Sequence, residues 1–151
     1  MKIVLQRVSE ASVEAEGRIA GRIGRGVCVL VGVEKGDRPE DAAFLAGKTV
    51  ELRIFPDEAG KMNLSLADIG GEVLAVSQFT LAGSVKKGRR PSFDTAEEPA
   101  RAEVLFGNFV ESIRGRGIKV ETGVFQTLMS VRIVNDGPVT FVLESSKSNP
   151  D

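Results

Sequence analysis

The chain has 151 residues, of which 42 % are hydrophobic and 27 % are charged. This length suits one domain, because a chain of this size buries about 70 % of the surface that its unfolded form exposes. The formal net charge is −1, so any RNA binding must come from a local basic patch rather than from the protein as a whole. We expect a single domain at 1–145 and a polar tail at 146–151.

The lack of histidine and the scarcity of cysteine limit the chemistry that the chain can perform. It contains no histidine and one cysteine, Cys28. The absence of histidine removes the usual base of Ser-His-Asp and Cys-His catalysis and the commonest zinc ligand. Cys28 stands in the apolar run "GVCVLVGV" and is interpreted as a small buried hydrophobe. Since no carboxylate cluster has a spacing that would hold a metal, we expect no metal and no cofactor.

The hydropathy pattern predicts a cytoplasmic protein without a membrane partner. No apolar stretch reaches the length of about 18 residues that a membrane span requires. The opening "MKIVLQRVSEASVEAE" becomes acidic and polar too early for a secretory signal.

The first third of the chain predicts strands joined by turns and then a helix. The strand candidates are "KIVLQRV", "ASVEAEG", "RIAGRIG" and "GVCVLVGVE", the last being a central strand covered on both faces. A helix follows, with Asp37 or Arg38 at its cap and Pro39 in its first turn. The helix should bury one face, formed by Ala42, Leu45, Thr49 and Leu52.

The rest of the chain alternates loops with strands around a second helix. "FPDEAGKMNLSLADIGG" predicts a loop with a short hairpin, "EVLAVSQFTLAG" a strand, and "SVKKGRRPSFDTAEEP" a polar surface loop. A second helix starts near Pro99 and ends at Gly115 and Gly117, and "IKVETGVFQTLMSVRIVNDGPVTFVLES" holds three further strand candidates. The apolar stripe of this second helix comprises Ala102, Leu105, Phe106, Phe109 and Ile113. The fold class is α+β, a mostly antiparallel sheet or open barrel with two main helices packed outside.

Three short segments could carry function. "SQFTL" places Ser77, Gln78 and Thr80 at the end of an apolar strand, where they mark a site or form cross-strand hydroxyl pairs. "KKGRR" is either a solvated charged face or a patch for phosphates. In "NDGPVT", the Gly-Pro pair interrupts an apolar stretch and is either a turn between two strands or a rigid backbone device.

These segments, in their order and spacing, resemble one enzyme family. "KMNLSL", "VSQFTL", "GRRPSF" and "NDGPVT", with the opening "QRVSEASV" and with "LVGVEKGD", look like the D-aminoacyl-tRNA deacylases of the bacterial and eukaryotic type. The resemblance covers essentially the whole chain. One departure is local, because the family usually has a Gly-Ala pair where this chain has Gln126 and Thr127, which affects the fine shape of the pocket.

The resemblance implies a homodimer with its active site at the subunit interface and an aminoacyl-tRNA as substrate. The Gly137-Pro138 bond would be cis and would project into the partner's site as a chiral filter. Residues of the implied site are the catalytic segment Ser77, Gln78, Phe79 and Thr80, the filter residues Gly137, Pro138, Asn135 and Arg7, and the tRNA-binding cations Lys86, Lys87, Arg89 and Arg90.

The implied reaction is hydrolysis of the ester that joins a D-amino acid, or glycine, to the tRNA ribose. Such an ester is already activated, so positioning of water and stabilisation of the oxyanion by backbone N–H groups suffice without a histidine base. Two alternatives remain at this point. One is a non-enzymatic RNA-binding module, and the other is a general esterase with Thr80 as nucleophile.

Overall fold

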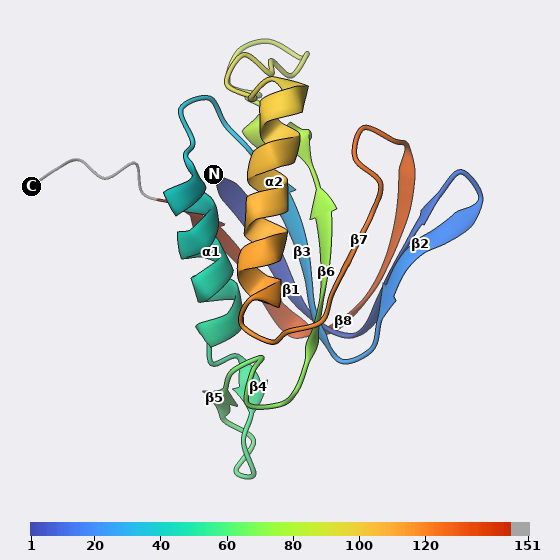
Figure 1. Cartoon of the computed structure of the whole chain (residues 1–151), viewed down its shortest axis with the longest axis vertical. Helices are drawn as coiled ribbons and strands as arrows, with labels where there is room; N and C mark the ends of the chain where they lie inside the picture. The colour runs from blue at the N-terminus through green and yellow to red at the C-terminus, as the bar shows by residue number, and fades with distance from the viewer. Residues whose placement is uncertain (146–151) are drawn as a thin grey trace, which may run out of the picture.

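The computed structural model describes residues 1–145, so the tail predicted at 146–151 lies outside the described residues. A six-stranded mixed sheet carries two helices side by side on one face (Figure 1), which confirms the predicted α+β class. The strands are β1 Lys2–Ala15, β2 Arg18–Ile23, β3 Gly26–Gly32, β6 Glu72–Ser77, β7 Val120–Thr122 and β8 Met129–Glu144, with β4 Phe55–Pro56 and β5 Met62–Leu64 as a separate hairpin. The helices are α1 Pro39–Glu51 and α2 Pro99–Arg114, with a short 3-10 helix, η1, at Phe79–Ala82.

Strand β1 runs unbroken through the stretch for which the sequence predicted two strands. Its first half pairs with β3, its second half pairs with β2, and β8 lies antiparallel along its other edge. The polar residues that suggested a break lie at two register shifts, one between Gln6 and Val8 and one between Val8 and Glu10. Bulges of this kind bend a strand without ending it, so one strand serves both halves of the sheet.

The sheet buries apolar side chains on both faces. Beneath the helices, Leu5, Val29 and Ala75 pack with Leu45 of α1 and Phe109 of α2. On the other face the curled sheet closes over a second cluster, which comprises Val8, Ala11, Val13, Ile23, Cys28, Leu74 and Val76. Strand β3 is therefore covered on both faces, as its continuous apolar run predicted.

Both helices begin and end close to the predicted residues. Arg38 is the cap of α1 and its backbone N–H donates to Asp41 Oδ2 at 2.8 Å, while Pro39 occupies the first helical position. Helix α2 begins at Pro99 and is capped by Gly115. Leu52 lies just past the end of α1 rather than on its face. Within residues 1–145, neither helix has the length and apolar character of a membrane span.

The C-terminal segment forms two strands, β7 and β8, where the sequence predicted three. Strand β8 continues through the Gly-Pro pair, which excludes a turn between two strands, one of the two alternatives for this pair. Asn135 pairs with Val8, and the next pair is Thr140 with Gln6, which leaves 136–139 opposite a single residue of β1. The proline thus sits in a wide bulge, where its missing N–H costs no ladder hydrogen bond.

A buried ion pair ties the beginning of the chain to the loop before α1. The Met1 ammonium group donates to Asp37 Oδ1 at 2.5 Å and to Ser145 Oγ at 2.9 Å, and both members of the ion pair are fully buried. Asp37 Oδ2 accepts the Glu34 N–H at 2.7 Å. This carboxylate therefore fixes the ends of β1 and β8 against the loop between β3 and α1.

We predict that Asp37→Ala lowers the free energy of unfolding by about 3–5 kcal/mol, because it leaves a buried ammonium group without a counter-ion. Denaturant titration would measure the loss. Glu51→Gln, which breaks an exposed pair with Arg116, is the control and should cost less than about 1 kcal/mol. Equal effects of the two substitutions would contradict the structural role of Asp37.

Candidate functional site

The segment "SQFTL" is a strand end followed by a tight turn, and the prediction of a strand running through it was wrong. Strand β6 ends at Ser77, and η1 begins at Phe79. The Gln78 N–H donates to the Val31 carbonyl at 2.7 Å, which turns the chain across the end of β3. Gly32 permits this approach, since a Cβ there would lie 2.7 Å from Leu81 Cβ. Side chains of this segment consequently do not alternate as in a strand.

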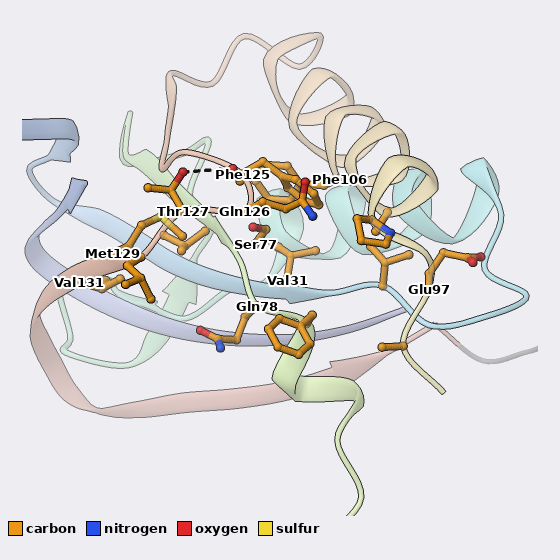
Figure 2. A pocket seen from close by; sticks show the side chains of 17 residues that line it. Val31, Ser77, Gln78, Glu97, Phe106, Phe125, Gln126, Thr127, Met129 and Val131 are labelled. Atoms are coloured by element: carbon orange, nitrogen blue, oxygen red, sulfur yellow. Dashed lines mark hydrogen bonds between the residues drawn. The ribbon is translucent and has the colours of Figure 1, made fainter. Parts of the chain in front are cut away.

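A cavity of about 620 Å³ opens at this strand end (Figure 2). Its floor comes from β3 and β6, one wall from α2 and the segment before it, and the opposite wall from the loop between β7 and β8. The lining is mostly apolar and comprises Val31, Val33, Val76, Ser77, Gln78, Phe79, Ala96, Glu97, Pro99, Ala102, Phe106, Phe125, Gln126, Thr127, Leu128, Met129 and Val131. A cleft of this size and character suits one small organic group.

Three of the four predicted catalytic residues line the cavity. Ser77, Gln78 and Phe79 do so, whereas Thr80 lies just outside, exposed, and its Oγ1 accepts a hydrogen bond from Gln78 Nε2. Within residues 1–145, the Ser77 hydroxyl has no hydrogen-bond partner, and neither do the backbone N–H groups of Phe79 and Thr80. The strand end thus places several polar groups without hydrogen-bond partners beside an apolar cavity.

Sequence reasoning missed the aromatic wall of the cavity. Phe106 was assigned to the apolar stripe of α2, but it is only half-buried, and its ring lies 6.3 Å from that of Phe125, centroid to centroid. The two rings reach the cavity from α2 and from the loop that follows β7. A half-buried phenylalanine has the same helical spacing as a buried one, so the sequence carried no signal that separates them.

The segment before α2 is held firmly against the loop that follows β3. The Lys35 N–H donates to the Thr95 carbonyl at 2.9 Å, and the Glu97 N–H donates to the Val33 carbonyl at 3.1 Å. Among residues 1–145, Glu97 is the one ionisable residue in the lining. Its carboxylate pairs with Arg101 at 3.1 Å and points away from the cavity in Figure 2.

The Gly137-Pro138 bond is cis and lies in the bulge of β8. Arg7 Nε donates to the Asp136 carbonyl at 2.8 Å and pairs with the Asp136 carboxylate at 3.2 Å, while Arg7 Nη1 donates to the Ile54 carbonyl at 2.6 Å. Asn135 Nδ2 donates to the carbonyls of Arg7 and Val139. A Cβ at Gly137 would meet Asn135 and the Val139 nitrogen, so only glycine fits there.

The four residues predicted as the filter are thus brought together, but away from the cavity. Among residues 1–145, Arg7, Asn135, Gly137 and Pro138 contribute nothing to its lining. Gly137 and Pro138 are exposed. The bulge therefore faces outward from the single chain.

The predicted basic segment forms the tip of a closed loop. Ser84 and Ser92 pair through two backbone hydrogen bonds of 2.8 and 2.9 Å, which closes the loop at its base. Beyond this base, Phe93 packs its ring 5.1 Å from that of Phe79 at the cavity rim. The four cations at the tip, Lys86, Lys87, Arg89 and Arg90, are exposed and form no ion pair within the described residues.

The shifted pKa values lie outside the cavity. Burial raises the pKa of the Cys28 thiol to about 12, so this cysteine is not a nucleophile at neutral pH. A backbone hydrogen bond from Ser65 lowers the pKa of Asp68, and one from Gly24, with help from Lys119, lowers that of Glu72. No cluster of three metal-ligating side chains occurs among residues 1–145.

The fold and the site define a class: an α+β protein whose apolar cleft stands at a strand end beside free backbone N–H groups. Residues 4–144 match the sequence model of the family described as D-Tyr-tRNA(Tyr) deacylase. The chain therefore belongs to this family and is a hydrolase.

Curated relatives and solved structures agree with this assignment. A D-aminoacyl-tRNA deacylase of Geobacter metallireducens is 60 % identical over 98 % of both chains. The same-named protein of Bacillus velezensis is 56 % identical over 97 % of this chain and 100 % of its own. A structure titled c-Myc DNA Unwinding Element Binding Protein superposes with a TM-score of 0.89 at 42 % identity, covering 96 % of this chain and 99 % of that one. A probable eukaryotic D-amino acid tRNA deacylase, 19 % identical with a TM-score of 0.83 and covering 95 % of this chain and 98 % of its own, shares the fold.

Proposed function

We propose that this protein hydrolyses the ester bond of D-aminoacyl-tRNA, and of glycyl-tRNA charged on a non-cognate tRNA, as a chiral proofreader in the cytoplasm. The observation that carries the proposal is the cavity at the end of β6, where the Ser77 hydroxyl and the N–H groups of Phe79 and Thr80 are free. The names of the relatives that match over nearly the whole chain support the same substrate.

The reaction needs little from side chains. Water attacks the ester carbonyl carbon, and the negative charge that develops on the carbonyl oxygen is stabilised by backbone N–H groups following the strand end. The bond from carbon to the ribose oxygen then breaks, that oxygen takes a proton, and the free amino acid leaves. The neighbouring ribose hydroxyl assists the proton transfers, because the chain has no histidine.

Selectivity in this proposal comes from the cis Gly137-Pro138 backbone of a partner subunit. An L side chain would collide with that backbone, whereas a D side chain points away and glycine has none. The outward-facing bulge, fixed by Arg7 and Asn135, supports this role. Because the filter consists of backbone atoms that make no specific contact with the side chain of a D-amino acid, many D-amino acids are accepted.

A homodimer is needed for that arrangement, and the surface of β8 supports one. Among the described strands, β8 pairs only with β1, so its other edge is open. Val134, Phe141 and Val142 on this strand are 49 %, 37 % and 63 % exposed. Exposed apolar side chains on an open strand edge are typical of an association surface.

We predict that the purified protein releases D-tyrosine from D-Tyr-tRNA rapidly and leaves L-Tyr-tRNA intact, because the filter admits only one configuration. Loss of each radiolabelled ester over time measures this. Equal rates for the two esters would favour an unselective esterase. If neither ester is lost with folded protein, the protein is instead an RNA-binding module.

We predict that Thr80→Ala retains activity to within about tenfold of the wild type, because it removes one neutral hydrogen bond worth about 1 kcal/mol. The side chain lies outside the cavity lining and has no adjacent base. Single-turnover hydrolysis of D-Tyr-tRNA would measure the effect, with a thermal melt to confirm folding. A loss of several orders of magnitude in folded protein would instead identify Thr80 as the nucleophile.

The loop at 84–92 is proposed to bind the tRNA backbone. We predict that replacing Lys86, Lys87, Arg89 and Arg90 by alanine weakens tRNA binding. The slope of the logarithm of the binding constant against the logarithm of the salt concentration should become shallower by up to about 3, because four phosphate contacts are lost. Fluorescence anisotropy over a range of salt concentrations would measure the slope. Lys48→Ala, an exposed cation on α1, is the control, and an unchanged slope in the loop variant would remove this assignment.

A further inference from the structure

Gln126 holds a backbone conformation that side-chain-bearing residues rarely adopt. Its φ is 55°, and among residues 1–145 the one other non-glycine residue with positive φ is Glu16, in the tight turn between β1 and β2. A left-handed conformation is disfavoured for a residue with a Cβ. Glycine would relieve it at no steric cost, so a glutamine at this position points to a use for its side chain.

The position of Gln126 indicates what that use is. The residue belongs to the turn between β7 and β8 and lines the cavity, with its side chain extending toward the α2 side in Figure 2. The Thr127 hydroxyl fixes the turn by donating to the Phe125 carbonyl at 3.3 Å. The Gln78 carboxamide is engaged with Thr80, but that of Gln126 has no hydrogen-bond partner within the described residues.

The neighbouring rings favour a flat aromatic ligand. Phe125 directly precedes Gln126, and Phe106 faces it from α2, with 6.3 Å between ring centroids. Unpaired RNA bases are recognised by stacking on such rings together with hydrogen bonds to the base edge. A carboxamide offers one donor and one acceptor side by side, the complement of the 6-amino group and adjacent ring nitrogen of adenine.

We propose that the Gln126 carboxamide is the specificity contact for the terminal adenine of the aminoacyl-tRNA. The inference rests on the proposed function, which brings the adenosine end of tRNA into this cavity. Gln126 accepts a hydrogen bond from the 6-amino group and donates one to the adjacent ring nitrogen. The unfavourable backbone conformation keeps this side chain over the cavity, while the chemistry takes place at the β6 end.

The test removes the same interaction from each side in turn. Two non-hydrolysable ligands are used, 3′-(D-tyrosylamido)-3′-deoxyadenosine and its counterpart in which purine replaces adenine and the 6-amino group is absent. Calorimetric titration gives the affinity ratio of the two ligands. Wild type should prefer the adenine compound by about tenfold, because purine keeps the ring nitrogen but cannot donate to the carboxamide oxygen and leaves that oxygen unpaired.

Gln126→Met keeps the side-chain length and the left-handed backbone but loses both hydrogen bonds, so its preference should fall to near one. Gln126→Gly should lose the preference equally while melting at the same temperature as wild type or higher, which separates recognition from folding. Val124→Ala, in the same loop but outside the cavity lining, is the control and should keep the wild-type ratio.

Two results would overturn the inference. In one, the Gln126 variants weaken the binding of both ligands by the same factor, which would mean that the residue affects only the shape of the cavity. In the other, the Gln126 variants bind both ligands as tightly as wild type does and keep the preference for adenine, which would assign adenine recognition to other groups. If wild type cleaves D-Tyr-tRNA in either case, the proposed function stands without this contact. If it neither cleaves that ester nor binds either ligand, both proposals fail.

Discussion

The antiparallel pairing of β1 with β8 is the constraint on which the rest of the structure depends. The two strands run along each other from Lys2 with Glu144 to Ala15 with Met129, and β3 and β2 pair in turn with the other edge of β1. A chain end is ordinarily the first part of a fold to fray. Here the Met1 ammonium group, Asp37 and Ser145 close that end in a buried cluster. The first and last strands are consequently held together where they meet.

The cavity depends on this frame through β3. Strand β6 lies parallel to β3 with Ser77 beside Val31, so the end of β6 is placed at the end of β3. The chain then turns back across Gly32, and the segment at 94–97 is hydrogen-bonded to the same end of β3. Chemistry that relies on backbone N–H groups requires such fixed geometry, because these groups cannot adjust as side chains do.

The sequence predicted the helices well because their signals are local. Pro39 and Pro99 mark helix starts and Gly115 a helix end, and each needs only its neighbours to act. The strands were harder, since polar residues near Ser9 and the Gly-Pro pair near 137 suggested ends where the structure has bulges. Whether a bulge or a turn forms depends on the partner strand, which lies more than a hundred residues away in sequence.

The candidate site shows the same contrast between local signals, which the sequence reveals, and long-range contacts, which it does not. The motif at 77–80 was identified from its residue types, but its geometry was not, because the strand ends at Ser77 through a hydrogen bond to Val31. Phe106 and Phe125 meet only once α2 packs over the sheet, so no spacing in the sequence joins them. The departure at Gln126 was visible as a residue type, whereas its left-handed backbone required the structure.

Strand β8 and the turn before it carry both of the proposed sources of selectivity. Met129 and Val131 at its beginning line the cavity, directly after the turn that holds Gln126, and the cis Gly-Pro bulge lies a few residues further along. In the proposed dimer, two-fold symmetry makes every contact reciprocal, so each β8 lines its own cavity and presents its bulge to the partner's. The proposed adenine contact, in the turn before β8, would then come from one subunit, and the proposed chiral filter of the same cavity would come from β8 of the other. Any distortion of β8 would therefore disturb substrate selection in both subunits together.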